Sequence, residues 1–344
     1  MSDTMKAILI KDGKGPVENL YIGDAERPRP KEKGQVIVKV KMFGLNRMDL
    51  IQREGKYPVP PNTTPILGVE FSGTIAEIAP DVTSVKVGDE VMGLAYGGAY
   101  AQYVMTYDHM VAPKPAHLSF VEAAGIPEVW LTAYQALFLV GKLQKGESVM
   151  IHAGASGVGI AANQLARRFG AKHVITTAGS AEKLDFLKSM PYAPTHTVNY
   201  KTEDFSEHVK EITSENGVDV IVDFIGKDYW DKNISSLARD GRLVYLAFMS
   251  GDKVPSFSIA PILYKRLSIL GTTLRSRTLE YQGDLMVQFK ENALPDILSE
   301  SAKPEVGGLR SYVHDVYPWT EIQRAHREMQ DNKTSGKIVL EVTE

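Results

Sequence analysis

Residues 149–162 read VMIHAGASGVGIAA, a short apolar run that leads through a glycine-rich turn into a helical pattern. We expect Gly154 to permit the tight turn and Gly159 to let the helix pack closely against the strand. The backbone amides near Ser156 would then face a pyrophosphate at the positive end of the helix dipole. Ser156 stands where the second glycine of G-x-G-x-x-G belongs, and Gly157 follows it. A glycine-rich turn that binds nothing is therefore the alternative.

The sequence after this turn favours cofactor binding, because apolar strand patterns alternate with helical patterns as far as about residue 273. The strand patterns occupy residues 148–153, 173–177, 195–199, 218–224, 241–248 and 267–273. The helical patterns occupy residues 158–169, 181–190, 205–216, 229–238 and 260–264. Six strands with five crossovers are typical of a complete doubly wound parallel sheet, so the fold class is α/β with a Rossmann domain.

The sequence on either side of this region has a different pattern. Up to about residue 117, short β-type runs are punctuated by turn residues, which indicates a barrel-like β unit. The runs are expected at residues 5–10, 35–43, 73–78, 90–94 and 99–105. Near the C-terminus, Thr320 and Gln323 have the spacing of a capping box, and Ile322, Ala325 and Met329 fall on one helical face. A last strand at residues 337–342 is expected to rejoin the N-terminal β unit.

Composition narrows the function classes. The 344 residues are 43% hydrophobic and 24% charged, and the net charge of −3 argues against nucleic acid or an anionic membrane as partner. Cysteine is absent, which excludes disulfides, thiolate nucleophiles and Cys-ligated metals. The sequence lacks a signal-peptide pattern and an apolar run of about 18 residues, so we expect a cytoplasmic protein without a membrane partner.

The second strand of the Rossmann pattern points to the cofactor. An NAD-binding strand ends in an acid that bonds the adenosine ribose, whereas residues 176–180 read TTAGS. Small residues leave room for a 2′-phosphate, to which Ser180 could donate and Lys183 could supply charge. Glu182 is expected to point outward from the start of the helix. NADPH is favoured, and a simple helix cap with a solvated lysine is the alternative.

Several stretches in a fixed order carry a family resemblance. They read GLNRMDL (44–50), IPEVWLTAY (126–134), HAGASGVG (152–159), TAGS (177–180), NYKTEDF (199–205), LRSR (274–277) and GKIVLE (336–341). With them the chain resembles the zinc-independent quinone oxidoreductases of the medium-chain dehydrogenase/reductase superfamily. The tumour-suppressor-inducible branch, related to zeta-crystallin, is the most similar.

The resemblance implies two domains. These are an N-terminal GroES-like β-barrel catalytic domain, residues 1–130 and 274–344, and an NADPH-binding Rossmann domain, residues 131–273. Zinc-dependent relatives have a cysteine where Asn46 stands and a histidine where Val69 stands. Their lobe of four cysteines has no counterpart here, so we expect no metal site.

The resemblance also implies a substrate pocket between the two domains, over the nicotinamide. Asn46, Tyr57 and Thr132 match positions that face the nicotinamide or the acceptor, and they are the candidate catalytic residues. Each also has a purely structural reading, as a turn residue for Tyr57 and an early-helix hydroxyl for Thr132. The candidate cofactor-binding residues are Asn46, Thr132, Gly154, Ser156, Gly157, Val158, Gly159, Gly179, Ser180, Lys183, Tyr200, Gly226, Phe248, Met249, Thr273, Leu274 and Lys337.

The expected reaction follows from the absence of a zinc site and of a Tyr–Lys pair in the sequence. Reduction of a simple ketone needs an electrophile such as zinc or a Tyr–Lys pair, whereas a quinone or enone yields a delocalised anion that water can protonate. We therefore expect an NADPH-dependent reductase of quinones or similar conjugated carbonyls, in which Asn46 and Tyr57 donate to the developing oxyanion. The alternatives are an enone or alkenal reductase, and a crystallin-like or RNA-binding protein with weak catalysis. Relatives pair edge strands, so a homodimer through residues 241–273 is expected.

Overall fold

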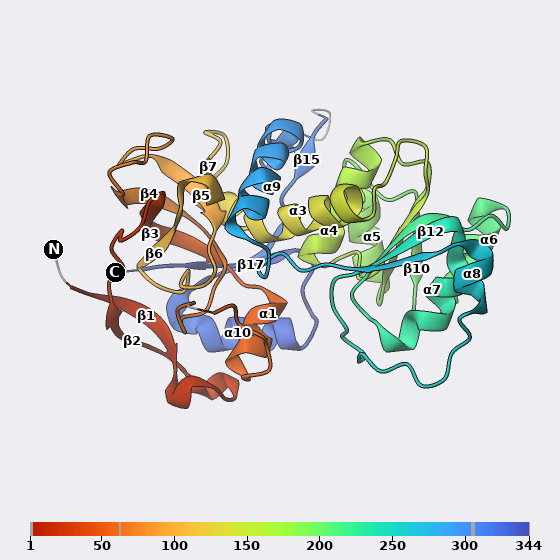
Figure 1. Cartoon of the computed structure of the whole chain (residues 1–344), viewed down its shortest axis with the longest axis horizontal. Helices are drawn as coiled ribbons and strands as arrows, with labels where there is room; N and C mark the ends of the chain where they lie inside the picture. Colours follow the sequence, from red (N-terminus) through yellow and green to blue (C-terminus); the bar gives the residue numbers. More distant parts are fainter. Residues whose placement is uncertain (1–2, 62, 304–306, 344) are drawn as a thin grey trace. The chain divides into compact units, whose positions relative to one another are not determined.

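The computed structural model describes residues 3–61, 63–303 and 307–343 and divides into two compact units (Figure 1). Unit 1 comprises Met1–Leu131, Leu274–Ala302 and Ser311–Glu344, and unit 2 comprises Thr132–Thr273 and Lys303–Arg310. The boundaries expected from the resemblance remain a prediction about domain organisation. Among the described residues, no helix has the length and apolar character needed to cross a membrane.

Within its described residues, unit 2 contains a six-stranded sheet in the order β10-β9-β8-β11-β12-β13, with every neighbouring pair parallel. The strands are β8 (Val149–Ile151), β9 (Val174–Ala178), β10 (His196–Asn199), β11 (Val218–Asp223), β12 (Leu237–Tyr245) and β13 (Ser268–Gly271). The helices are α4 (Gly157–Arg168), α5 (Ala181–Ser189), α6 (Phe205–Thr213), α7 (Trp230–Ser236) and α8 (Ala260–Lys265). This is the strand order of a dinucleotide-binding sheet, which confirms the Rossmann prediction.

Burial explains why these runs form strands. Met150, Ile175, Ile221 and Leu243 come from four adjacent strands and are fully buried in one apolar cluster. Such near-continuous apolar runs are typical of parallel strands that are covered on both faces. The apolar pattern of the sequence is thus explained by burial of these strands between two layers of helices.

The boundary between α7 and β12 differs from the prediction. The helix expected at residues 229–238 ends at Ser236, and β12 begins at Leu237 instead of residue 241. Leu237 is 1% exposed and pairs with Val218, so burial in the sheet outweighs the helical pattern there. A register shift between Val218 and Val220 accommodates the irregular stretch that follows, where Asp240 has a φ of 62°.

Unit 1 is built around a seven-stranded sheet within its described residues, in the order β16-β17-β3-β4-β5-β7 with β6 paired to β3. Its strands are β3 (Gln35–Gly44), β4 (Glu70–Ile78), β5 (Glu90–Leu94), β6 (Tyr103–Tyr107), β7 (Val111–Pro113), β16 (Val313–Pro318) and β17 (Lys337–Glu341). A hairpin of β1 (Thr4–Ile10) and β2 (Leu20–Glu26) lies beside it. The short β14 (Ile297–Leu298) and β15 (Leu309–Arg310) complete the strands of the described chain.

Five more α-helices lie in the remaining described residues. They are α1 (Arg47–Arg53), α2 (Phe120–Ala124), α3 (Pro127–Tyr134), α9 (Leu279–Asn292) and α10 (Ile322–Gln330). The division between the units falls within α3. The predicted run at residues 99–105 proved shifted, because β6 begins only at Tyr103.

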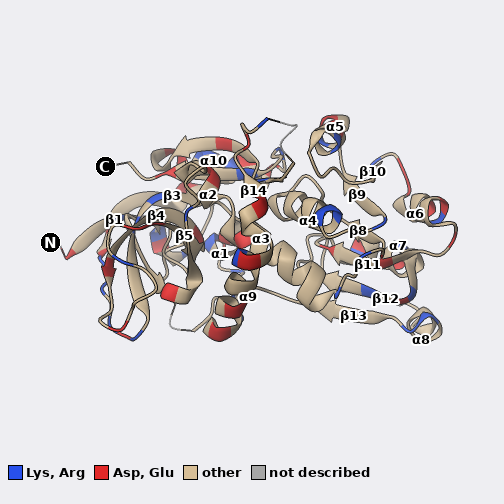
Figure 2. Ribbon diagram, turned by 90° about the horizontal axis from the view of Figure 1, so that it is seen from above, with Lys and Arg blue, Asp and Glu red and all other residues tan. Residues whose placement is uncertain are grey.

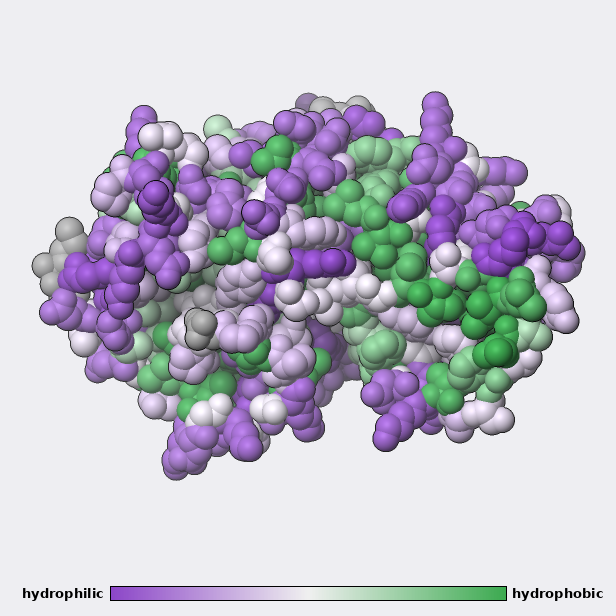
Figure 3. Space-filling model, in the orientation of Figure 1, coloured by the Kyte–Doolittle hydropathy of each residue, from purple (hydrophilic) through white to green (hydrophobic). Residues whose placement is uncertain are grey.

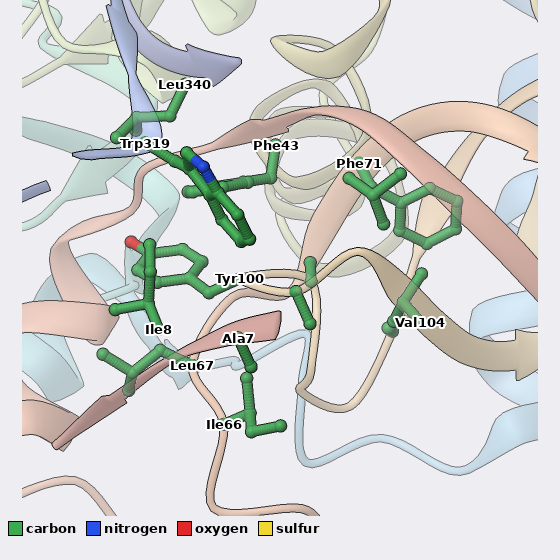
Figure 4. Close-up of a cluster of buried hydrophobic side chains, with 14 of the residues drawn as sticks. Ala7, Ile8, Phe43, Ile66, Leu67, Phe71, Tyr100, Val104, Trp319 and Leu340 are labelled. Atoms are coloured by element: carbon green, nitrogen blue, oxygen red, sulfur yellow. The ribbon is translucent and has the colours of Figure 1, made fainter. Parts of the chain in front are cut away.

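The core of unit 1 lies between the hairpin, the sheet and α10 (Figure 4). The rings of Phe43 and Tyr100 pack with centroids 4.3 Å apart, and Trp319 lies beside them (Figure 4). Ile8 and Leu340, from the two ends of the chain, are fully buried in the same cluster. The last strand thus joins the N-terminal β unit as expected, because β17 pairs with β3.

The capping box predicted at residues 320–323 was wrong. Residues Trp319–Glu321 form a 3-10 turn, and α10 begins after Glu321, which caps without a side-chain hydrogen bond. The amide of Gln323 instead donates to the carbonyl of Leu20 at 2.9 Å, because the tertiary contact satisfies it better than the local one. The predicted apolar face was correct, since Ile322 is 2% exposed.

Candidate functional site

The glycine-rich turn of unit 2 joins β8 to α4 and is shaped for close backbone approach. Ser156 is the N-cap of α4, and its Oγ accepts a hydrogen bond from the amide of Gly159 at 3.1 Å. A helical amide donates to the carbonyl four residues earlier, and for Gly157 and Val158 that carbonyl lies before the helix begins. These first-turn amides therefore have no acceptor within the helix. These amides and the Ser156 hydroxyl hydrogen form a suitable cradle for an anionic group at the helix start.

Glycine is required in this turn for lack of space. A Cβ on Gly154 would clash with Oγ1 of Thr176, and a Cβ on Gly159 would clash with the carbonyl oxygen of Ala153. The expected reason for Gly154 needs correction, because the positive φ of the turn, 49°, belongs to Ala153. Gly154 is instead needed for its contact with β9, while Gly159 has the expected role in close packing.

A series of hydrogen bonds between buried side chains holds this turn against the neighbouring strands. Asp223 only accepts, so the 2.9 Å bond from Nδ2 of Asn233 fixes the orientation of that amide. The Asn233 oxygen then accepts from Nε2 of His152 at 2.8 Å, and the Thr177 hydroxyl donates to Nδ1 at 3.1 Å. Burial lowers the pKa of His152, in keeping with this neutral tautomer. His152 is therefore structural, held by the side chains of Asn233 and Thr177.

The end of β9 gathers the residues proposed for the adenosine end of the cofactor. Ser180 caps α5, with its Oγ accepting from the amide of Lys183 at 3.4 Å. A Cβ on Gly179 would lie 2.7 Å from the hydroxyl of Tyr200, so the tyrosine lies directly against the glycine. Glu182 is exposed, as expected. The observed cap is the structural alternative for Ser180, and its hydroxyl also forms a hydrogen bond with the Glu182 carboxyl group.

The other predicted cofactor residues of unit 2 lie at strand ends or in α3. Gly226 has a φ of 87°, and a Cβ there would lie 2.9 Å from the ring of Phe248. Phe248 and Met249 are about half exposed, at 52% and 51%. Thr273 is exposed and Thr132 lies partly buried in α3. The structure therefore brings Gly226 together with Phe248.

Unit 1 contains a buried cluster around Asn46, the N-cap of α1. Its Nδ2 donates to Oε1 of Glu70 at 2.8 Å, and its Oδ1 accepts from Nζ of Lys337 at 2.8 Å. Lys337 also forms an ion pair with Glu70 at 2.5 Å and donates to the carbonyl of Leu45 at 2.8 Å. All three donors of the ammonium group are thus used inside unit 1. The structure therefore brings together Asn46 and Lys337, two of the predicted cofactor-binding residues. Leu274, another of them, is buried, with 4% of its surface exposed.

Glu128 extends this cluster. It is 6% exposed, and its backbone amide donates to Oε2 of Glu70 at 2.9 Å. Burial and the neighbouring Glu70 carboxylate raise the pKa of Glu128 to about 8. Its carboxyl group is therefore protonated at neutral pH, whereas Glu70 is fixed by donors from three residues.

A second series of buried hydrogen bonds fixes the start of α1. Arg53 has only donors, so its 3.2 Å contact requires Nδ1 of His326 to accept and places the proton on Nε2. Nε2 lies 3.4 Å from the hydroxyl of Tyr100, which donates to Oδ2 of Asp49 at 3.1 Å. Burial lowers the pKa of His326 to about 3 and raises that of Asp49 to about 6. Oδ2 of Asp49 also accepts from the amide of Asn46 at 2.8 Å, which anchors that residue.

Tyr57 lies partly buried beside Arg275, whose guanidinium carbon is 5.4 Å from the centre of the tyrosine ring. Burial raises the pKa of Tyr57, although the positive charge of Arg275 opposes the change. The phenol is therefore neutral and able to donate a hydrogen bond at physiological pH.

Sequence reasoning missed Asp49, Glu70, Glu128, Arg275 and His326. Asp49, Glu128 and Arg275 stand in stretches that carried the resemblance, but none of these three was given a role there. Ionisable residues inside apolar patterns were the available signal, because buried charges need specific partners. Within the described residues, no group of three or more His, Cys, Asp or Glu side chains is arranged to hold a metal ion.

Two family models match the chain. The alcohol dehydrogenase GroES-like domain matches residues 32–116, and the zinc-binding dehydrogenase model matches residues 157–290. The first match confirms the GroES-like fold expected for the N-terminal part. The second covers α4 and the strands that follow it.

Curated relatives match over most of the chain. A quinone oxidoreductase from Lama guanicoe is 31% identical over 340 residues, which cover 98% of this chain and 97% of that protein. A highly-reducing polyketide synthase from Aureobasidium melanogenum is 33% identical over 95% of this chain, and a VAT-1 homolog from Danio rerio is 32% identical over 90%. This chain spans 14% of the first and 64% of the second.

Solved structures show the same architecture. A mycobacterial protein complexed with NADPH has a TM-score of 0.83 and 27% identity, covering 98% of this chain and all of that one. The CurK enoyl reductase has a TM-score of 0.81 and 30% identity, covering 99% of this chain and all of that one. The quinone oxidoreductase of Coxiella burnetii has a TM-score of 0.77 and 30% identity, with coverage of 99% and 100%.

Proposed function

Because the chain belongs to the zinc-independent quinone oxidoreductase family of the medium-chain dehydrogenase/reductase superfamily, we propose that it is an NADPH-dependent quinone reductase. NADPH would supply the hydride, and the chain would bind and orient the reactants. The observation that carries this proposal is the Asn46 amide, whose oxygen and one N–H are held by Lys337 and Glu70. Its second N–H remains for a carbonyl oxygen that gains negative charge.

Each candidate catalytic residue has a separate role in this proposal. Asn46 offers a donor whose direction is set before substrate arrives, which reduces the reorganisation needed during reaction. Tyr57 offers a neutral phenol as a second donor, and Thr132 orients the nicotinamide. Lys337, whose donors are all used, acts by positioning Asn46 and not by contacting the cofactor directly.

The glycine cradle supports a dinucleotide cofactor, and the end of β9 supports NADPH in particular. Ser156, Gly157 and Val158 would hold the pyrophosphate, and Ser180 with Lys183 would hold the 2′-phosphate. The NADPH complex of the mycobacterial neighbour supports this choice, and residues 176–180 at the end of β9 include no acid. Gly226, Phe248, Met249, Thr273 and Leu274 are proposed to line the rest of the cofactor site.

The cofactor proposal is tested on α5. Lys183→Glu should raise the KM for NADPH at least tenfold and leave the KM for NADH unchanged, because only NADPH carries the 2′-phosphate. Lys188→Glu is the matched control, since Lys188 lies on the same helix, is exposed and forms an ion pair with nearby Asp185. Equal effects of Lys183→Glu on both cofactors would refute the assignment.

The reaction is tested by following NADPH oxidation with 1,4-benzoquinone, an ortho-quinone and a non-quinone enone. NADPH-selective turnover of the quinones, unchanged by a metal chelator, is the expected result. Turnover of the enone alone would favour the second candidate, a double-bond reductase, which the similarity to the CurK enoyl reductase supports. NADPH binding without turnover would favour a non-enzymatic role.

We also propose a cytoplasmic homodimer that forms through β13, the edge strand of the unit 2 sheet. Hydrophobic residues gather on the surface near α8 (Figure 3). Among them, Ile259, Leu263 and Tyr264 are 69%, 72% and 74% exposed, which favours a protein partner over water. Positions of Lys and Arg alternate with positions of Asp and Glu along the ribbon of both units (Figure 2), which disfavours the RNA-binding alternative. Light scattering at micromolar concentration tests the dimer.

A further inference from the structure

Arg275 is a buried cation whose hydrogen bonds go to neutral acceptors. It is 2% exposed, its Nε donates to the carbonyl of Tyr96 at 2.8 Å, and its Nη1 donates to Oε1 of Gln52 at 2.6 Å. Its Nη2 donates to the same Tyr96 carbonyl at 2.5 Å. None of the ion pairs among residues 3–61, 63–303 and 307–343 includes Arg275.

This arrangement is costly unless an anion completes it. A guanidinium keeps its charge in proteins, and a buried charge without an opposite charge destabilises the folded state. Burial lowers the pKa of Arg275, because the loss of water disfavours its charged form. Three of its five N–H groups are used by Tyr96 and Gln52, so these hydrogen bonds fix the position of the charge and bring no opposite charge to it.

Asp49 offsets the charge only in part, because burial lowers the pKa of Arg275 more than the negative charge of Asp49 raises it, and no ion pair within the described residues joins the two. Asp49 directs Oδ2 to the amide of Asn46 and to Tyr100, and its Oδ1 accepts from the amide of Gly68 at 3.3 Å. Glu128 is protonated at neutral pH because burial raises its pKa to about 8. The group that faces the guanidinium is instead the partly buried ring of Tyr57, 5.4 Å away.

We propose that Arg275 and Tyr57 form an anion-stabilising pair that selects acceptors whose reduction leaves a phenolate-like or enolate-like oxygen. The Tyr57 hydroxyl donates to that oxygen, and Arg275 supplies the positive charge behind the phenol. This proposal rests on the proposed function and provides the electrophile that zinc supplies in related dehydrogenases. The acceptor gains two electrons and one proton from NADPH, which becomes NADP⁺, and water protonates the oxygen anion.

The pair is tested without catalysis by the ionisation of 4-nitrophenol, whose phenolate absorbs visible light. The full chain saturated with NADP⁺ is titrated with 4-nitrophenol at several pH values. Bound 4-nitrophenol should ionise at least one pH unit below free 4-nitrophenol, a tenfold or greater preference for the anion. Arg275→Gln should abolish the difference, Arg275→Lys should restore part of it, and Tyr57→Phe should reduce it.

Arg277→Gln is the matched control, because Arg277 lies two residues away with its guanidinium over the separate ring of Tyr281. This variant should ionise bound 4-nitrophenol as the wild type does. Unshifted ionisation in the wild type, or an equal shift in wild type and Arg275→Gln, would overturn the proposal. Tyr57→Phe removes only a partly exposed hydroxyl, so it preserves the test if Arg275→Gln does not fold.

Activity separates the two proposals. Shifted ionisation in a wild type that reduces no quinone would reject the proposed function and keep the anion-stabilising pair. Rapid quinone reduction without shifted ionisation would reject the pair and keep the function. With both correct, Arg275→Gln should lower kcat for 1,4-benzoquinone at least tenfold and leave the NADPH dissociation constant unchanged.

Discussion

Replacement of Glu128 by glutamine should stabilise the protein, and the gain should grow with pH. Glu128 is 6% exposed, and burial together with Glu70 raises its pKa from 4.5 to about 8. Between these two values the folded chain keeps a proton that the unfolded chain has lost. Stability therefore falls as pH rises through this window, by up to about 1.36 kcal/mol per pH unit. The glutamine side chain has a similar shape and does not titrate, so the Glu128→Gln variant escapes this loss.

The magnitude follows from the two pKa values. The gain in unfolding free energy should be below about 1 kcal/mol at pH 4.5, about 3 kcal/mol at pH 7 and about 5 kcal/mol at pH 9. Titration of other groups, including Asp49, is common to both proteins and cancels in the difference. Urea unfolding followed by tryptophan fluorescence measures it, because Trp130 and Trp319 are both buried in unit 1.

Glu122→Gln provides a control with the opposite sign. Burial alone would raise the pKa of Glu122, but hydrogen bonds from Ser299 and Ser119 outweigh it and lower that pKa. The stabilisation from ionised Glu122 is present above pH 4.5 and is lost as the pH falls. Glu122→Gln should therefore destabilise the protein at pH 7, and should destabilise it less at pH 4. Parallel pH profiles for wild type and Glu128→Gln would refute the reasoning about Glu128.

Three further changes have defined outcomes. Lys337→Met should lower the unfolding free energy by about 3–5 kcal/mol, because the Glu70 carboxylate would stay buried without its cation; a loss below 1 kcal/mol in urea would contradict this. Gly159→Ala should weaken NADPH binding at least tenfold in a fluorescence titration, whereas Gly307→Ala, with open space around its Cβ, should leave it unchanged. Leu263→Glu should convert the proposed dimer into a monomer in light scattering, and a persistent dimer would place the interface elsewhere.

Prediction from sequence succeeded where neighbouring residues decide the outcome. The apolar runs of unit 2 gave the six strands, and their order followed because each connection returns to the same sheet. The reason for Gly154 was wrong, since the space beside Thr176 is decided by β9 and not by the turn. The Thr320 cap failed similarly, because Gln323 found a tertiary partner in Leu20.

The sequence alone determined the fold class, the glycine turn and the absence of cysteine, because periodicity, turn residues and composition are local properties. Only the tertiary structure decided which polar groups are buried together. Lys337 reaches Asn46 across 291 positions of sequence, and Arg275 reaches Gln52 across 223. The charge state of a buried group depends on the solvent it loses and the partners it gains, and both are set by packing between distant segments.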